Sequence, residues 1–597
     1  MSGTYSRRYD VIVIGAGFSG ICAAIKLLEA GIDNLLIVEK ADRVGGTWRD
    51  NDYPGAACDV MAHLYSLSFA PNPAWNHRFP PQDEILAYLE QVADRHGLTP
   101  HIRFGTEIVE QSFDDEQDEW LLVSGSGRQW RARAVIAGTG PLHVPKIPAL
   151  AGADAFAGAQ FHSARWDHGV DLEGKVVAVV GTGASAVQIV PAIVDTAGRV
   201  VVFQRTPHWV LPRPALPITR AERALFRLVP GSRVLARGAI YLAQEALIGA
   251  FLHPRLMSAL RAVARRHLRR QVSEPDLRAA LEPDYEIGCK RILISSDYYP
   301  ALQRPDVSLV TSPITGIEPE GIRTDDGGLH EADAIVYATG FDVLDHVTEQ
   351  RLRGRAGTPI QQVWRDGAKG YYGVAVHGLP NYFLIMGPNS GVGNQSIVFV
   401  IESQVELIVR CLHALFDGEY TRVEVKSHVQ AEFNRELQRR SAGTVWTAGG
   451  CRSWYLDHAG VNRALWPTST LSLRLRMRRI ALGDFDFSTA DDREDGETYT
   501  GSATLSTDDG TQITARVRLL ARYEPVPDTV KWQGRVEPTP ELARLHTQVN
   551  QAIRIQVPGR DAVDGVLVDT DPWGGAQLVG WGRSPYRIDV EAAVLGD

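Results

Sequence analysis

Two glycine-rich turns have the residue types and spacing that bind dinucleotides. In the first, residues 9–40 read YDVIVIGAGFSGICAAIKLLEAGIDNLLIVEK, which predicts a buried strand, a turn, a helix and a second strand. Gly15 permits the tight turn, Gly17 lets the backbone approach a pyrophosphate, and Gly20 lets helix and strand pack closely. Glu39 ends the second strand, where a carboxylate accepts hydrogen bonds from a ribose diol. These features predict a first dinucleotide site.

A second turn repeats the same order of elements over residues 175–205, with alanine at the third glycine position. The difference lies at the end of the second strand, where Arg205 stands in place of Glu39. A guanidinium there matches the 2′-phosphate of NADPH, which a carboxylate would repel, although a strand-end arginine can also be an ordinary surface charge. We therefore assign FAD to the first site and NADPH to the second. The contacts predicted for the second site are Gly181, Gly183, Ser185, Arg205 and Thr206.

The elements that must position these turns define an α/β fold with two Rossmann-like dinucleotide-binding domains. Strand-like segments at Ala134–Gly140 and Ala332–Asp342 end in small residues and look like crossing points between the domains. The second domain is then inserted in the first. The predicted boundaries are 1–145 and 330–480 for the FAD domain, 146–329 for the NADPH domain, 214–287 for a helical insert within it, and 481–597 for a C-terminal β-rich domain.

The insert and the C-terminal part differ from the nucleotide domains in composition and in the spacing of their apolar residues. The insert carries apolar residues at helical spacing, and its basic run at Ala264–Val272 also suits a weak contact with a membrane surface. Ser488–Glu497 is an acidic, polar linker. The strand-like sequence beyond it contains Asp509 and Gly510, a pair typical of a hairpin turn. It shows no metal-ligand cluster, and no metal site is predicted.

Composition excludes several other classes of protein. The 597 residues carry a net charge of -9, so nucleic acid is not an expected partner. The five cysteines lack any CxxC pair, which indicates reduced thiols, a cytoplasmic location and no disulfide reductase activity. The N-terminal sequence lacks a signal pattern, so export is not expected. The most apolar stretch, AIYLAQEALIGAFL, is interrupted by Gln244 and Glu245, and no transmembrane segment is predicted.

Two longer motifs resemble those of a known family. FAGAQFHSARWD has the spacing FxGxxxHxxxW followed by an acid, and GGTWRDNDYPGAACD has the spacing GxWxxxx[FY]PGxxxD. Both closely resemble fingerprints of the Baeyer–Villiger monooxygenases, the class B flavin-dependent monooxygenases, over about residues 8–470. The C-terminal part resembles a small domain of unknown function attached to some flavin monooxygenases. The fixed motif positions are Phe156, Gly158, His162, Trp166 and Asp167, and Gly46, Trp48, Tyr53, Pro54, Gly55 and Asp59.

The resemblance implies an FAD- and NADPH-dependent enzyme of EC class 1.14.13. Such an enzyme inserts one oxygen atom of O2 next to a carbonyl, through a flavin peroxide, and gives an ester or lactone. By the same resemblance Arg291 is the catalytic arginine, Asp59 orients it, and Lys290 contacts the 2′-phosphate. His162 would couple domain movement to turnover, and Trp48 lies near the cofactor.

The residues alone leave other interpretations open. Outside the motifs, Asp59 reads as a turn acid, Arg291 as a surface arginine and His162 as a packing histidine. Oxidation of sulfur or nitrogen by the same flavin is the nearest alternative activity, followed by an uncoupled NADPH oxidase or a flavoprotein binding module. Ala57 stands where several relatives have arginine, which bears on substrate contacts. Substrate identity and oligomeric state are not predicted.

Overall fold

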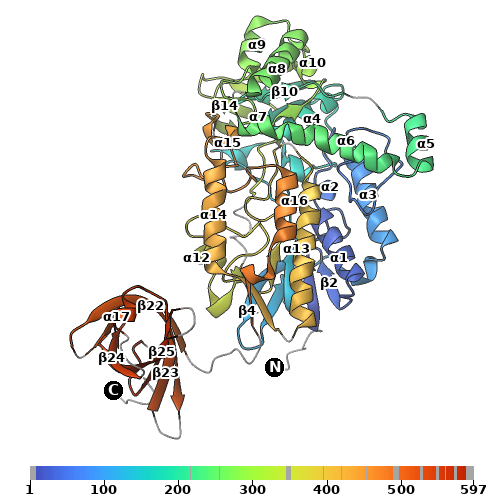
Figure 1. The fold of residues 1–597 in the computed structure, drawn as a ribbon. Helices are drawn as coiled ribbons and strands as arrows, with labels where there is room; N and C mark the ends of the chain where they lie inside the picture. The colour runs from blue at the N-terminus through green and yellow to red at the C-terminus, as the bar shows by residue number, and fades with distance from the viewer. Residues whose placement is uncertain are drawn as a thin grey trace. The chain divides into compact units, whose positions relative to one another are not determined.

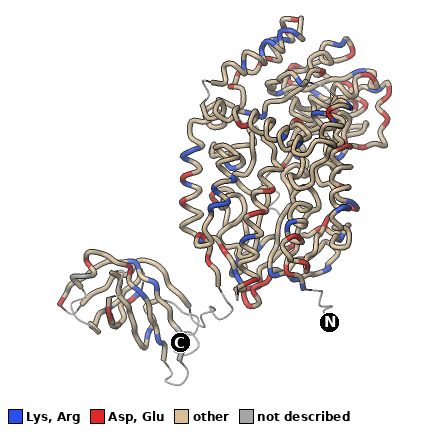
Figure 2. The backbone as a smooth tube through the Cα atoms, turned by 45° about the vertical axis from the view of Figure 1, so that its right-hand side comes forward, with Lys and Arg blue, Asp and Glu red and all other residues tan. Residues whose placement is uncertain are grey.

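The computed structural model describes two compact units, Met1–Ser488 and Thr489–Asp597 (Figure 1). Figure 2 shows acidic and basic residues interspersed along most elements of the first unit. The predicted polar linker falls almost wholly outside the described residues. The described residues are 8–488, except 215–216, 254–255, 344–350, 394, 419 and 452, and 497–586, except 508, 525–528, 546–549, 559 and 571–573.

The first unit contains a sheet of order β17-β4-β5-β6-β1-β2-β3, with β18 also paired to β6. β1 lies between β6 and β2 and is parallel to both, while β4, β5 and β6 form an antiparallel meander. The strands therefore come from two distant stretches of the chain. Their bounds are β1 Arg8–Ile14, β2 Leu35–Val38, β3 Ile102–Arg103, β4 Ile108–Asp114, β5 Glu119–Ser124, β6 Gln129–Ala137, β17 Arg351–Arg353 and β18 Tyr382–Leu384.

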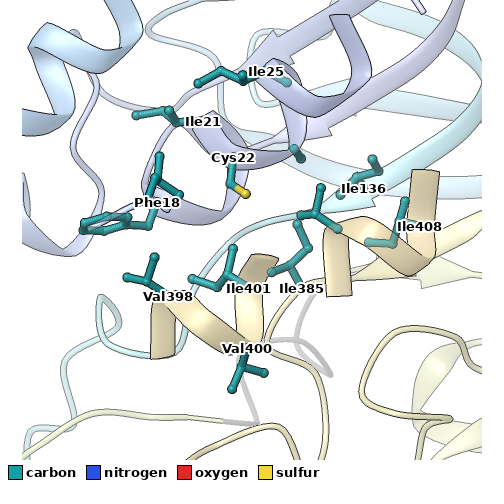
Figure 3. Packing of buried hydrophobic residues seen from close by; sticks show 14 of the residues in the cluster. Phe18, Ile21, Cys22, Ile25, Ile136, Ile385, Val398, Val400, Ile401 and Ile408 are labelled. Atoms are coloured by element: carbon teal, nitrogen blue, oxygen red, sulfur yellow. The ribbon is translucent and has the colours of Figure 1, made fainter. Parts of the chain in front are cut away.

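Helix α1 (Phe18–Glu29) follows the first glycine turn and packs against α13 (Ile397–Asp417), with apolar side chains on both facing surfaces (Figure 3). Cys22 and Ile25 of α1 are buried at 0% and 1% exposure, as is Ile401 of α13 at 3%. Burying apolar side chains of this size stabilises the fold by about 1.5–3 kcal/mol each. The helix that opens at the first turn is thus fixed by a segment almost four hundred residues further along the chain.

A second sheet, of order β12-β9-β8-β16-β7, is parallel throughout. Near-continuous apolar strands such as VVAVV are typical of a parallel sheet covered on both faces. All its strands lie between β6 and β17 in the chain, so this Rossmann-like unit is inserted in the first, as the sequence predicts. The predicted boundary at residue 329 leaves out β16, which pairs with β7 and β8 in this sheet. The bounds are β7 Ala159–His162, β8 Val176–Val180, α4 Ala184–Ile193, β9 Arg199–Phe203, α10 Tyr298–Leu302, β12 Val307–Val310 and β16 Ala334–Tyr337.

Helices dominate the predicted insert. The basic helix α8 packs into the unit through Ala264 and Leu268, both 2% exposed, so it is not a free amphipathic surface. The run Ser232–Leu252 has the length and the mean hydropathy, 1.3, of a membrane-crossing helix, so the expectation of no such segment is not confirmed. Only 6% of that run is buried. The helices are α5 Arg220–Leu228, α6 Ser232–Ala246, α7 Ile248–Leu252, α8 Met257–Gln271 and α9 Pro275–Leu281.

Shorter elements complete the first unit around the two sheets. β13, β14 and β15 form a small antiparallel sheet, β10 pairs with β11, and β19 pairs with β20. The remaining bounds are α2 Thr47–Asp50, α3 Gln82–Arg95, β10 Val210–Leu211, β11 Leu293–Ile294, β13 Ile314–Glu318, β14 Gly321–Thr324, β15 Leu329–Glu331, α12 Ile360–Val363, β19 Arg422–Val425, α14 Ser427–Ser441, α15 Val445–Ala448, α16 Thr470–Arg479 and β20 Phe485–Ser488.

The C-terminal unit is a closed barrel of order β21-β22-β23-β26-β25-β24. Ser506 pairs with Gln512, which confirms the hairpin predicted at Asp509 and Gly510. Trp532 is fully buried within the barrel core. The bounds are β21 Glu497–Ser506, β22 Gln512–Glu524, β23 Thr529–Val536, α17 Leu542–Leu545, β24 Gln551–Gln556, β25 Val563–Thr570 and β26 Ala576–Trp581.

Candidate functional site

The first glycine turn has no room for side chains. Gly15 has a φ of +97°, and a Cβ added there would lie 2.8 Å from the carbonyl oxygen of Gly138. A Cβ on Gly20 would lie 1.8 Å from the carbonyl oxygen of Gly15. Gly17 is the N-cap of α1, where no side chain caps the free backbone N–H groups. The turn is therefore a cradle whose open N–H groups suit a pyrophosphate.

Glu39 follows β2 and lies beside this cradle. Its carboxylate is buried, at 4% exposure, and accepts hydrogen bonds from Ala16 N at 2.8 Å and Ala41 N at 3.0 Å. Arg49 Nη1 lies 3.0 Å from the same carboxylate. These contacts fix the acid in place and leave lone pairs free for further hydroxyl donors. Nearby, Trp48 donates its indole N–H to Tyr65 Oη at 3.1 Å.

The second turn repeats the geometry with a more open entrance. Gly181 has a φ of +115°, and a Cβ there would lie 2.4 Å from the carbonyl oxygen of Ala338. Gly183 is the N-cap of α4, and a Cβ added to it would meet nothing within 4 Å. Ser185 lies in the first turn of α4. Ala186 is fully buried, so here the helix accepts a methyl group where the first turn does not.

Two cations lie beyond the second turn. Arg205 follows β9 and is exposed, while Lys290 is partly buried with Nζ 4.9 Å from the ring centroid of Tyr285. The pKa of Lys290 is lowered by burial and by the positive charge of Arg205. Neither cation forms an ion pair with a carboxylate in the described part of the chain. Thr182 Oγ1 donates to the carbonyl of Thr206 at 2.9 Å and holds the segment that follows Arg205.

Arg291 and Asp59, which lie 232 residues apart in the chain, form a bidentate pair. Arg291 Nε donates to Asp59 Oδ2 at 2.6 Å, and Arg291 Nη2 donates to Asp59 Oδ1 at 2.7 Å. Burial disfavours the charged form of Asp59, but the attraction of the Arg291 guanidinium outweighs this effect. The pKa of Asp59 is therefore lowered. The carboxylate in turn raises the pKa of Arg291. The pair is therefore permanently ionised and geometrically fixed.

One cavity of about 1460 Å³ joins both turns and this ion pair. Its volume is larger than that of a typical single-ligand pocket, which indicates room for more than one molecule. Gly20 and His162 do not line it, since both are packed behind the wall. The predicted residues that line it are Gly15, Gly17, Glu39, Trp48, Asp59, Gly181, Gly183, Ser185, Arg205, Thr206, Lys290 and Arg291.

His162 ends β7 and is 1% exposed. Its Nδ1 accepts a hydrogen bond from Ala164 N at 3.1 Å, and its ring lies edge-on to Phe341, with centroids 5.6 Å apart. Burial lowers the pKa of His162 to about 4, so the ring is neutral at pH 7. Phe341 and Gly340 line the cavity, and His162 contacts both of them from behind the wall. A direct catalytic contact is not supported by this position.

Three further residues of the cavity wall escaped the sequence prediction. His208 lies three residues after Arg205, and burial together with Lys290 lowers its pKa to about 4. Tyr455 is buried beside Arg291, and burial raises its pKa to about 12. Gln188 accepts from Tyr53 Oη at 2.9 Å and donates to Ala57 O at 2.9 Å. The signals were weak, since His208 and Tyr455 are single polar residues outside a motif and Gln188 is not at a fingerprint position of the second turn.

The prediction of five reduced thiols is wrong for two cysteines. Cys289 and Cys451 form a disulfide with a Cα–Cα distance of 6.1 Å, whereas Cys22, Cys58 and Cys411 are free and buried. The partners are 162 residues apart, so no local motif announced the pair. The bond ties the segment that carries Lys290 and Arg291 to the segment that carries Tyr455.

No three His, Cys, Asp or Glu side chains gather into a group that could hold a metal ion in the described ranges. Residues 12–217 match a family model described as pyridine nucleotide-disulphide oxidoreductase. Residues 496–588 match a model described as a domain of unknown function, DUF4873. The first match covers both glycine turns, and the second covers the barrel.

Curated relatives match most of the first unit. A protein of Streptomyces coelicolor named Baeyer-Villiger monooxygenase is 45% identical over 477 residues, which are 80% of this chain and 92% of that protein. A protein of Pseudomonas aeruginosa with the same name is 41% identical, covering 81% of this chain and 92% of that protein.

Solved structures agree in fold. A closed crystal structure of cyclohexanone monooxygenase is 28% identical, with a TM-score of 0.74, and covers 81% of this chain and 100% of its own. An oxidised steroid monooxygenase bound to NADP is 31% identical, with a TM-score of 0.72, and covers 81% of this chain and 99% of its own. The crystal structure of an OTEMO complex with FAD and NADP is 26% identical, with a TM-score of 0.73. It covers 80% of this chain and 99% of its own.

Proposed function

Because the chain belongs to the Baeyer–Villiger monooxygenases, which are flavin-dependent enzymes, we propose that it inserts one oxygen atom of O2 next to the carbonyl of a small organic substrate. The product is an ester or a lactone. The observation that carries this proposal is the bidentate Arg291–Asp59 pair in the wall of a cavity that both glycine turns also line.

The residues present fit FAD in the first turn and NADPH in the second. The glycine cradle before α1 and the fixed carboxylate of Glu39 suit a pyrophosphate and a ribose diol. Arg205 and Lys290 suit the 2′-phosphate, because they are neighbouring cations without a described ion-pair partner. When bound, NADPH supplies the hydride and the reduced flavin supplies the activated oxygen.

Arg291 supplies fixed positive charge. Asp59 occupies its Nε and Nη2, while Nη1 has no hydrogen-bond partner in the described ranges and remains free to donate. A guanidinium stays protonated throughout the working pH range, so it stabilises negative charge on a reacting oxygen. Asp59 keeps it from turning away, and the buried Tyr455 lies close enough to interact with the guanidinium electrostatically.

The test is product formation from a panel of ketones and sulfides by the holoenzyme with NADPH and O2. We expect ketone oxygenation in the wild type and a loss of about 10²–10³-fold in Arg291→Ala, as for removal of a preorganised oxyanion donor. Arg304→Ala is the matched control, because that arginine does not line the cavity and is ion-paired to Asp195 and Asp306. The ketone rate of this control should match wild type.

Anaerobic reduction by NADPH followed by oxygen addition separates the alternatives. Slow return of the oxidised flavin spectrum, with ester formed from ketone, supports the proposal. Sulfide oxidation that persists in Arg291→Ala, with no ester from any ketone in wild type, would instead assign heteroatom oxidation. Immediate reoxidation with one H2O2 per NADPH in every variant would assign an oxidase.

A further inference from the structure

Helices α5 and α6 lie at the edge of the first unit (Figure 1), and this part of the chain exposes a set of large aliphatic side chains. Leu228 is 78% exposed, Leu235 is 76%, Val234 is 73% and Leu242 is 64%. Contiguous exposed apolar surface on a soluble protein marks an interaction site. We call this set, with Val229, Ala239 and Ala246, the aliphatic face.

The pattern of α6 is inverted with respect to an ordinary surface helix. Leu235, Ala239, Leu242 and Ala246 recur at helical spacing, and all four are exposed. A helix on a globular protein normally turns such a stripe inward and its polar residues outward. The outward stripe is therefore expected to contact an apolar partner surface when the protein functions.

The polar residues of α6 hold it on the protein body. Arg237 Nη1 donates to His63 O at 2.9 Å, and Tyr241 Oη is 3.0 Å from Thr470 Oγ1. Glu245 accepts from Leu471 N at 3.0 Å and from the Thr470 hydroxyl at 2.9 Å. These hydrogen bonds fix which side of the helix faces out. The helix therefore cannot rotate to bury the exposed stripe without breaking them.

Arginines surround the tip of the aliphatic face. Arg220, Arg223 and Arg227 share a surface hollow with Leu228, and Arg233 precedes Val234. None of the four arginines forms an ion pair with a carboxylate in the described ranges.

The one acid on α5 is already engaged. Glu222 caps the helix at Thr219 and pairs with Arg78 at 2.6 Å. The charge around the aliphatic face is therefore uncompensated and positive.

We propose that the aliphatic face, with these four arginines, docks on the surface of an anionic lipid bilayer. Aliphatic side chains enter the boundary between headgroups and acyl chains, while arginines reach the phosphates. The run Ser232–Leu252 is apolar enough to cross a membrane, but crossing would break the contacts of Arg237, Tyr241 and Glu245. The helix therefore lies on the membrane.

A second copy of the chain fits this surface less well. Twofold pairing through the aliphatic face would bring the unpaired arginines of both copies together, and Glu222, the acid on α5, is already paired with Arg78. Lipid phosphates supply the missing negative charge. The inference concerns attachment alone and does not depend on the proposed reaction.

The experiment is cosedimentation of the full-length holoprotein with vesicles of phosphatidylcholine, alone or with one quarter phosphatidylglycerol. We expect several-fold more protein to sediment with the anionic vesicles, and a fall when NaCl is raised to about 0.5 M. Leu228→Ser with Leu235→Ser and Leu242→Ser, and separately Arg227→Gln with Arg233→Gln, should each abolish the difference.

Arg269→Gln with Arg270→Gln on α8 is the matched control, because both arginines are exposed on another helix of the insert and should not affect sedimentation. Flavin content and melting temperature report that each variant is folded. Binding that is absent in wild type overturns the proposal, as does binding lost only in the α8 variant. A wild-type dimer that the leucine variant converts to a monomer, with unchanged sedimentation, would assign the face to a second copy.

Discussion

The two glycine turns share one backbone design and differ in how their charges are balanced. At the first, Glu39 is buried and already held by two backbone N–H groups and Arg49. At the second, Arg205 and Lys290 repel each other and have no described acid within ion-pair distance. The acid of the first site is balanced by contacts within the protein, whereas the two cations of the second are offset only in part by the charge of Asp284 and gain full balance from an anionic ligand. This difference suits one cofactor that stays and one that exchanges.

Gly20→Ala should have the largest effect, because the new Cβ would lie 1.8 Å from the Gly15 carbonyl oxygen. We expect loss of about 3 kcal/mol or more of unfolding free energy and protein without flavin. The measurements are flavin absorbance per protein and chemical denaturation. Gly183→Ala is the control for the second turn, where a Cβ meets nothing within 4 Å, and it should keep wild-type flavin content. Equal losses of flavin and of unfolding free energy in both variants would contradict the difference between the two turns.

Arg205→Ala should come next, with KM for NADPH raised roughly 30–100-fold and KM for NADH nearly unchanged. The estimate follows from losing one charge-assisted contact with the 2′-phosphate. Steady-state kinetics with both nucleotides checks it. An equal change for NADPH and NADH would show that Arg205 acts on structure and not on the phosphate.

Lys290→Met should raise KM for NADPH by about 10-fold and change its pH dependence. The folded pKa of Lys290 is lowered from 10.5, so the wild type loses this charge, and with it NADPH affinity, at lower pH than an unperturbed lysine would. In Lys290→Met the alkaline rise in KM should disappear. Persistence of that rise would assign it to another group.

Cys451→Ser should have the smallest effect on cofactor binding, a rise in KM for NADPH of about 3-fold with unchanged flavin content. The disulfide anchors Cys289, the residue before Lys290. Glu39, at the first site, is held by hydrogen bonds and an ion pair and not by a disulfide. Closing so long a loop stabilises the fold by about 5 kcal/mol in the chain-entropy model, so the melting temperature should also fall. Reduction of the wild type by dithiothreitol should reproduce both changes, and Cys411→Ser, at a buried free thiol, is the control.

Sequence alone predicted what depends on neighbours in the chain. The turn glycines, Glu39 and Arg205 lie in continuous strand–turn–helix patterns, and the observed β2 is the second strand predicted within residues 9–40. The pairing of Asp59 with Arg291 joins residues 232 positions apart, and only the resemblance to a family suggested it. The disulfide was missed for the same reason, because contact between distant segments is a property of the folded chain.

The outward direction of the apolar stripe on α6 could not be predicted from the sequence, for a different reason. Its apolar spacing was visible, but spacing does not say which way a stripe faces. Only the bonds of Arg237 and Glu245 to the body settle that. The sequence suggested the basic run on α8 as a membrane contact instead. In the structure, Arg261 and Arg265 of that helix pair with Glu286 and Glu282.

The split of the first sheet also sets an order of events during synthesis. Every strand of the second sheet has been synthesised once residue 337 is added, whereas β18 and α13, which complete the first sheet and cover α1, follow only at residues 382–417. The nascent chain is thus expected to hold a closed second nucleotide fold while the first still awaits its last strand. Flavin would enter a growing protein whose other site is already built.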